Sequence, residues 1–236
     1  MKNVLVAGAG GAIGGSLVRM LLARGDVQVF ATSRSEQRLH DLRKTLEPRA
    51  QPLFVPIAGD AGDFSGASEV AERVEKLGGI DCAVAIFGRG VWTSGPLLDL
   101  SPGDWRTVLD EMLTAHFAFA QAVFPILSPR PGSLYVSLGG GAAFGPMRDA
   151  GLMSIAAAGQ VMLTRILDRE STADYPRVIE LIINAAVGEA EPRDASQISA
   201  DEVAHVLSEL LLTGTTTWTN ATSNGPLIVM NPGGTG

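Results

Sequence analysis

The chain of 236 residues is short of cysteine, lysine and tyrosine, and it contains no long apolar run. Its single cysteine, Cys82, excludes an intrachain disulfide, and such sparse cysteine is typical of a reducing compartment. No apolar stretch approaches the roughly 18 residues that a membrane-spanning helix needs. The net charge of −7 argues against nucleic acid or an anionic membrane as the main partner. We therefore expect a cytoplasmic protein that binds a small molecule, with no nucleic acid, membrane or metal among its partners.

Glycine is concentrated near the N-terminus, where a short apolar run breaks into a tight turn and then resumes with helical spacing. Glycines in such a turn let the backbone approach a bulky anion, and the first amides of the new helix point at that anion. A turn of this kind between a strand and a helix favours a dinucleotide phosphate site. The residues that we expect to form it are Gly8, Gly10, Gly11, Ala12, Ile13 and Gly14.

Apolar runs alternate with helical segments along the whole chain, and 46% of the residues are hydrophobic. Strands are expected at 4–7, 27–32, 53–57, 80–88, 133–138, 177–183 and 226–230, and one long helix at about 102–127. This order predicts an α/β fold, a Rossmann-like doubly wound parallel sheet of about seven strands with helices on both faces. We expect a single domain over residues 1–236.

The residues that follow the second and third strands bear on which dinucleotide would bind. Ser33 and Arg34 stand where an NAD-specific site usually has an acid, so they favour the 2′-phosphate of NADP(H) over NAD(H). The alternative is that Ser33 only caps the next helix while Arg34 is solvated. Asp60, followed by Ala61, is placed to accept a hydrogen bond from an adenine amine.

The chain resembles the short-chain dehydrogenase/reductase family, in its classical type, over essentially all of its length. The likeness rests on the turn at 7–14, on Asp60, on the strand that ends at Gly88, and on the segments 100–105 and 231–234. The resemblance implies that the turn, Asp60 and Gly88 bind the cofactor. It also implies a homodimer or homotetramer, in keeping with the broad apolar surface of the long helix and the alanines at 156–158.

The catalytic residues that the resemblance implies are missing from this chain. Family members use an asparagine, a serine and a Tyr-x-x-x-Lys pair, in which the tyrosine delivers a proton and the lysine lowers its pKa. The asparagine position falls on Met112, the serine position on Gly139 or Gly140, the tyrosine on Met153 and the lysine on Ala157. The three lysines are Lys2, Lys44 and Lys76, so none lies in the catalytic half.

Three other polar residues are weak catalytic candidates, since they lie near the positions that lack the usual groups. His116 follows Met112 by one helical turn, and Ser137 and Ser154 flank the serine and tyrosine positions. The alternatives are a histidine at a subunit interface and serines that only pack. The methionines and glycines at the replaced positions favour a bulky or apolar substrate, because methionine fills irregular space.

Three functions remain open at this point. The first is an atypical NADPH-dependent oxidoreductase whose proton comes from water, from the substrate or from another group. The second is a catalytically inactive relative, either a cofactor-binding regulator or a partner subunit. The third is a non-redox isomerase or cyclase on the same fold. The acidic loop at 188–194 is a candidate lid over the site.

Overall fold

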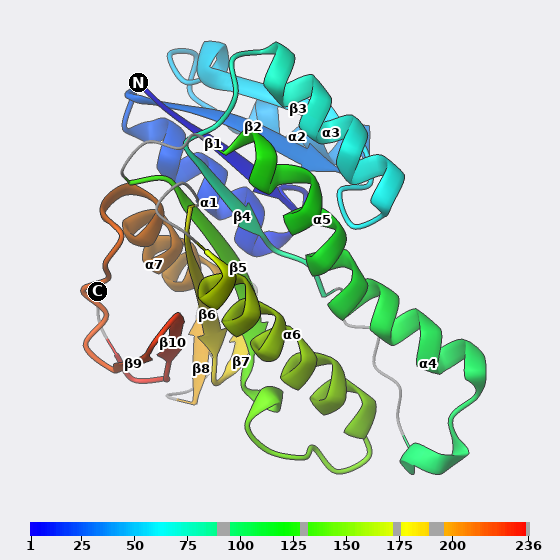
Figure 1. The fold of residues 1–236 in the computed structure, drawn as a ribbon. Helices are drawn as coiled ribbons and strands as arrows, with labels where there is room; N and C mark the ends of the chain where they lie inside the picture. Colours follow the sequence, from blue (N-terminus) through cyan, green and yellow to red (C-terminus); the bar gives the residue numbers. More distant parts are fainter. Residues whose placement is uncertain (89–94, 128–131, 172–175, 189–195, 235–236) are drawn as a thin grey trace.

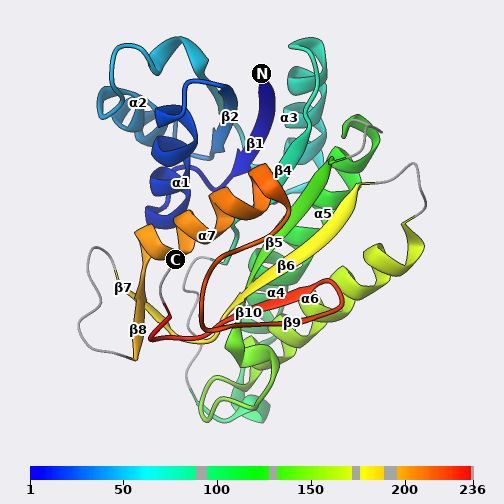
Figure 2. The same ribbon diagram turned by 90° about the vertical axis from the view of Figure 1, so that its left-hand side faces the viewer.

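The computed structural model describes residues 1–88, 95–127, 132–171, 176–188 and 196–234, and their central feature is an eight-stranded sheet. The strand order is β3-β2-β1-β4-β5-β6-β10-β9, and every pairing is parallel except that of β9 with β10. Helices cover both faces of this sheet (Figures 1 and 2). The predicted doubly wound parallel sheet is therefore confirmed.

Most strands lie close to the predicted runs, but the fourth covers 82–85 and not 80–88, and three strands were not predicted. They are β1 (Lys2–Ala7), β2 (Val27–Ser33), β3 (Phe54–Ala58), β4 (Cys82–Ala85), β5 (Leu134–Gly140), β6 (Arg177–Ile183), β7 (Ala186–Gly188), β8 (Gln197–Ser199), β9 (Ala221–Asn224) and β10 (Leu227–Met230). The short parallel pair of β7 and β8 forms a separate sheet, and β9 is an exposed edge strand. None of these three strands was predicted, because the short segments lack an apolar alternation.

Seven α-helices are present among the described residues. They are α1 (Ala12–Ala23), α2 (Glu36–Lys44), α3 (Phe64–Lys76), α4 (Pro102–Leu109), α5 (Ala115–Val123), α6 (Gly151–Glu170) and α7 (Ala200–Thr213). Ser101 with Asp104, and Ser199 with Glu202, form complete capping boxes at the starts of α4 and α7. Short 3-10 turns, at Gln51–Leu53, Leu97–Asp99, Phe124–Ile126 and Gly141–Ala143, connect several elements.

The predicted helix over 102–127 is not one regular helix. Between α4 and α5 lies η3 (Asp110–Thr114), a turn of π-helix, and the last residues form a 3-10 turn. A π turn holds one residue more than an α turn, so it rotates the side chains that follow it relative to an ideal helix. Residues of η3 line the cavity that is described in the next section.

The core has two layers, one on each side of the sheet. Side chains alternate along β1, so that Val4 and Val6 pack toward α1, α2 and α7, while Leu5 and Ala7 pack toward α3 and α5. Figure 2 shows α1 and α7 side by side on one face, with α5 and α6 on the other. Both faces of the central strands are buried, which explains their continuously apolar sequences.

No helix among the residues that the structure describes is long and apolar enough to cross a membrane. The candidate lid at 188–194 falls almost wholly outside the described residues, since these end at 188 and resume at 196.

Candidate functional site

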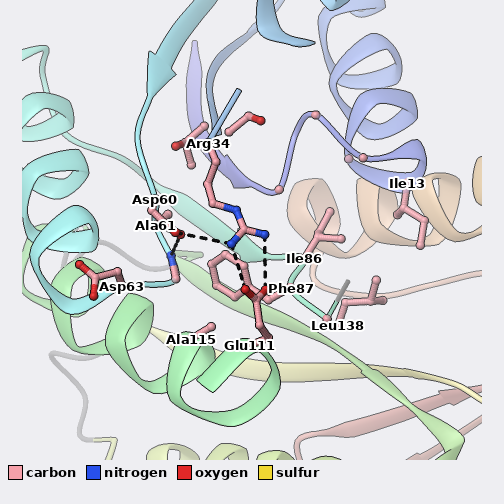
Figure 3. Close-up of a pocket in the computed structure, with 18 of the residues that line it drawn as sticks. Ile13, Arg34, Asp60, Ala61, Asp63, Ile86, Phe87, Glu111, Ala115 and Leu138 are labelled. Atoms are coloured by element: carbon pink, nitrogen blue, oxygen red, sulfur yellow. Dashed lines mark hydrogen bonds and ion pairs between the residues drawn. The ribbon is translucent and has the colours of Figure 1, made fainter. Parts of the chain in front are cut away.

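A cavity of about 690 Å³ opens at the carboxyl ends of the parallel strands and brings the predicted cofactor residues together. This edge of a doubly wound sheet is where ligands bind in such folds. All the predicted binding residues line it: Gly8, Gly10, Gly11, Ala12, Ile13, Gly14, Ser33, Arg34, Asp60, Ala61 and Gly88. They come from the first turn, from the ends of β2 and β3, and from the end of β4 (Figure 3).

Two positions of the glycine turn, Gly8 and Gly14, have no room for a side chain. Gly8 has a φ of +86°, and a Cβ at this residue would overlap the carbonyl oxygen of Ile86. A Cβ at Gly14 would overlap the carbonyl oxygen of Gly8, so glycine is required for α1 to start this close to β1. The N-terminal turn of α1, with Gly11 as its cap residue, therefore presents its amides to the cavity.

Two arginines face the cavity, Arg34 directly after β2 and Arg38 in the first turn of α2, and the sequence indicated only Arg34. Arg34 and Arg38 both line it, together with Ser33. A Cβ on Gly10 would come within 3.2 Å of the Arg38 side chain, so Arg38 lies directly over the glycine turn. The cap of α2 is Ser35, whose side chain accepts a hydrogen bond from the Arg38 amide, and not Ser33. Ser33 Oγ instead accepts a hydrogen bond from the Ser35 amide at 3.2 Å.

Arg34 is not simply solvated, because two acids hold its guanidinium group. Its two terminal nitrogens lie 3.0 and 3.4 Å from the two carboxylate oxygens of Glu111, and Nη1 lies 3.6 Å from Oδ2 of Asp60. The hydrogen bond with Glu111 is the main reason that the pKa of Arg34 is raised. Asp60 also accepts a hydrogen bond from the Gly62 amide at 3.1 Å. Figure 3 shows Arg34 reaching between the ends of β2 and β3 and the helix that carries Glu111.

The wall opposite the glycine turn was missed by the sequence reading. The cavity side of the long helix carries Asp110, Glu111, Thr114 and Ala115, all in or next to the π turn η3. The sequence prediction had a regular helix there, and the family resemblance placed the asparagine position on Met112 instead. A signal in the sequence was the acidic pair Asp110-Glu111, which stands among apolar residues of this helix.

None of the three weak catalytic candidates lines the cavity. His116 is 2% exposed, its ring lies edge-on to Phe87 with ring centroids 5.2 Å apart, and burial lowers its pKa to about 3. Ser137 is buried, with Oγ 3.3 Å from the Thr164 hydroxyl. Ser154 accepts a hydrogen bond from the Met147 amide and donates one to the Gly145 carbonyl, so it orders the loop before α6.

The replaced family positions do not line this cavity, and several of them form packing contacts. Met153 belongs to a small apolar cluster between α4 and α6, and Met112 packs against it. Ala157 is buried, as is Ala156, so these two alanines face the protein's own core and only Ala158 is exposed. The idea that the alanines at 156–158 form an intersubunit face is therefore wrong for two of the three.

At the serine position, a buried carboxyl group fills the available space. A Cβ on Gly139 would overlap Oε1 of Glu180, while Gly140 is exposed and has open space around it. Glu180, on β6, is 1% exposed, and neither of its oxygens has a hydrogen-bond partner among the described residues. Burial raises its pKa to about 7, against weaker opposing effects of Thr164 and Arg165.

In the described part of the chain, no group of three or more His, Cys, Asp or Glu side chains is arranged to hold a metal ion. The cavity does fit a dinucleotide, with glycines that exclude side chains at one end and two arginines beside Ser33 at the other. Such a site binds phosphate groups by backbone amides and by guanidinium groups.

Comparison with known proteins agrees with this geometry. Residues 2–182 match the family model of the short chain dehydrogenases. An uncharacterized oxidoreductase of Staphylococcus saprophyticus is 23% identical over 181 residues, which are 76% of each chain. The alcohol dehydrogenase of the archaeon Thermococcus sibiricus, solved with 5-hydroxy-NADP, has a TM-score of 0.80 at 18% identity and covers 99% of this chain and 97% of its own. A short chain dehydrogenase of Burkholderia cenocepacia, solved with NADP, has a TM-score of 0.76 at 21% identity, with 98% and 96% covered. By its sequence and by its fold, the chain belongs to the short-chain dehydrogenase family.

Proposed function

We propose that this protein is an atypical NADP(H)-dependent oxidoreductase that acts on a bulky or apolar carbonyl compound without the usual Tyr/Lys pair. The observation that carries the proposal is the cavity itself, on which the glycine turn, Ser33, Arg34, Asp60 and Gly88 converge. Phosphate-binding groups lie at both ends of this cavity, and their retention indicates that the chain still binds a dinucleotide there.

The cofactor preference rests on the positive charge that follows β2, from Arg34 after the strand and Arg38 in α2. Arg34 and Arg38 lie beside Ser33, at the place where an acid would bind the ribose hydroxyls of NAD. The two solved neighbours that hold NADP or a derivative of it support the same class of ligand for this chain. NAD(H) is the weaker candidate because it offers these arginines no 2′-phosphate.

The bound nicotinamide would supply the hydride, and the chain's own residues would hold the reactants. The amides of Gly11, Ala12 and Ile13 would bind the pyrophosphate, and Asp60 would accept a hydrogen bond from the adenine. Among the described residues that line the cavity there is no tyrosine, lysine or histidine to deliver a proton. The proton would therefore come from water or from the substrate, and proximity would be the main source of rate acceleration.

A second candidate function is favoured by the packing at the replaced positions. Met112 and Met153 pack together, and Glu180 fills the space beside Gly139, so the usual catalytic groups have been replaced by packed side chains. A cofactor-binding regulator or an inactive partner subunit would keep the cavity and lose only the chemistry. An isomerase or cyclase that shapes an apolar substrate is the remaining alternative.

We also propose a cytoplasmic homodimer or homotetramer. Large apolar side chains remain 40–52% exposed along α4, α5 and α6, and contiguous apolar patches often mark protein–protein interfaces. They are Trp105, Phe117, Ile155, Met162 and Ile166. A second copy of the chain is the partner that this proposal names for them.

The test is the consumption of NADPH, followed by the loss of nicotinamide absorbance, with a panel of apolar and polar carbonyl compounds. We expect turnover with apolar ketones or aldehydes, and a higher KM for NADPH in Arg34→Gln. If NADPH binds but no compound is reduced, the regulator is the better assignment. If NADPH does not bind, both assignments are wrong.

A further inference from the structure

The cavity is crossed by an ion pair that connects its two walls. The Arg34 guanidinium group comes from the end of β2, and the Glu111 carboxylate that it contacts comes from the helix on the opposite side. The contact is two-pronged, with nitrogen–oxygen distances of 3.0 and 3.4 Å. Both side chains line the cavity, and about a third of each is exposed, at 39% and 31%. Solvent and ligands therefore reach the pair.

The π turn holds Glu111 in this position. Within η3, Asp110 and Glu111 line the cavity, whereas Leu113 packs away from it. A Cβ on Gly159 of α6 would lie only 2.9 Å from Leu113 Cδ2, so the two helices are in close contact at this turn. The Thr114 hydroxyl donates a hydrogen bond to Asp110 at 3.3 Å across the same turn. Glu111 is thus held opposite Arg34 by the packing of its own helix.

A carboxylate and a phosphate monoester compete for the same guanidinium face. Each of these oxyanions can accept two parallel hydrogen bonds from the N–H groups of one arginine. Arg34 is the cation that a 2′-phosphate would need, yet Glu111 already takes both of its terminal nitrogens. A ligand without that phosphate leaves the pair intact, whereas a ligand with it must displace Glu111 and remain near a carboxylate.

We propose that Glu111 is a specificity-determining residue, which weakens the binding of ligands that carry a phosphate on the adenosine ribose by competing for Arg34. The inference rests on the proposed dinucleotide site and deepens it. Arg38 and Ser33 also line the cavity, and the hydrogen bonds and ion pair of Glu111 go to Arg34, so these two residues remain available to the phosphate. The ratio of the affinities for NADP(H) and NAD(H) is therefore smaller than it would be if both arginines were unpaired. Glu111 determines how much smaller it is.

The test compares two adenine nucleotides of similar charge that differ in the place of their second phosphate, 2′,5′-ADP and 5′-ADP. Their dissociation constants are measured by calorimetry with the wild-type protein, with Glu111→Gln and with Asp110→Asn. The Asp110 variant is the matched control, because this acid lines the same wall and loses the same charge but makes no ion pair with Arg34. Circular dichroism checks that each variant is folded.

We expect Glu111→Gln to bind 2′,5′-ADP roughly fivefold tighter, as for the loss of a half-exposed competing ion pair, with little change for 5′-ADP. Asp110→Asn should change both ligands by the same small factor. The inference is overturned if Glu111→Gln leaves the affinity for 2′,5′-ADP unchanged, or if it shifts both nucleotides equally. If the wild-type protein binds neither nucleotide nor NADPH, it is the proposed dinucleotide site that fails.

Discussion

Replacing Glu180 by glutamine removes a buried group whose ionisation opposes folding. Glu180 lies on the central strand β6, 1% exposed, and its carboxyl oxygens have no hydrogen-bond partner in the described part of the chain. Burial raises its pKa from 4.5 to about 7, so the folded protein keeps a proton that the unfolded chain releases between these values. Folding stability contributed by this residue therefore falls as the pH rises from 4.5 to 7 and is constant above 7.

The size of the effect follows from the same two values. One pKa unit corresponds to about 1.4 kcal/mol, so the span from 4.5 to about 7 amounts to about 3 kcal/mol of stability lost at alkaline pH. Glutamine has the shape of the protonated carboxyl group and cannot ionise. Glu180→Gln should therefore match the wild-type protein below pH 4.5 and exceed it by about 3 kcal/mol above pH 7.

Urea unfolding at a series of pH values measures this difference directly. The control is Glu75→Gln on the exposed side of α3, which removes a surface carboxylate of the same type. The reasoning is refuted if the difference between Glu180→Gln and the wild-type protein does not change with pH. A variant that is less stable at every pH would show that the Glu180 carboxylate is well solvated or paired.

Further predictions concern acid stability, a helix cap, the glycine turn and assembly. His116 is neutral in the fold, where burial lowers its pKa from 6.5 to about 3, so stability falls as the pH drops through this range, and His116→Gln should reduce that loss in urea unfolding. Ser199→Ala removes the capping box of α7 and should cost about 1 kcal/mol, measured by thermal unfolding, while an unchanged midpoint would contradict the cap. Gly8→Ala places a Cβ on the Ile86 carbonyl and should lower both stability and NADPH affinity; retention of both would show that the turn is adaptable. Phe117→Glu adds a charge to the exposed apolar surface of α5 and should yield monomers in sedimentation; monomers in the wild-type protein would refute the proposed assembly.

The sequence predicted the binding wall because its residues follow one another in simple local order. The glycine turn, Ser33, Arg34 and Asp60 each come directly after a strand, and the carboxyl ends of parallel strands share one edge of the sheet. Alternating apolar runs likewise predicted the parallel strands. The antiparallel strand β9 was not predicted, because its residues are mostly exposed and carry no apolar pattern.

The opposite wall was not predictable in the same way, because it depends on packing between distant segments. The π turn at Asp110–Thr114 forms where Leu113 meets Gly159 of α6, and neither residue signals this contact locally. Glu180 was read as part of a buried strand, and only the structure places its carboxyl group beside Gly139. His116 was a weak candidate for the cleft, on the assumption of a regular helix, and it is instead buried in the core directly after the π turn.

The most direct test of the account is a fluorescence titration of the protein with NADPH and, in parallel, with NADH. The account predicts that both bind in the cavity, that NADPH binds tighter, and that Arg34→Gln weakens NADPH roughly tenfold while leaving NADH nearly unchanged. Binding of neither nucleotide would contradict it, since the glycine turn and the arginines would then line a cavity with some other ligand.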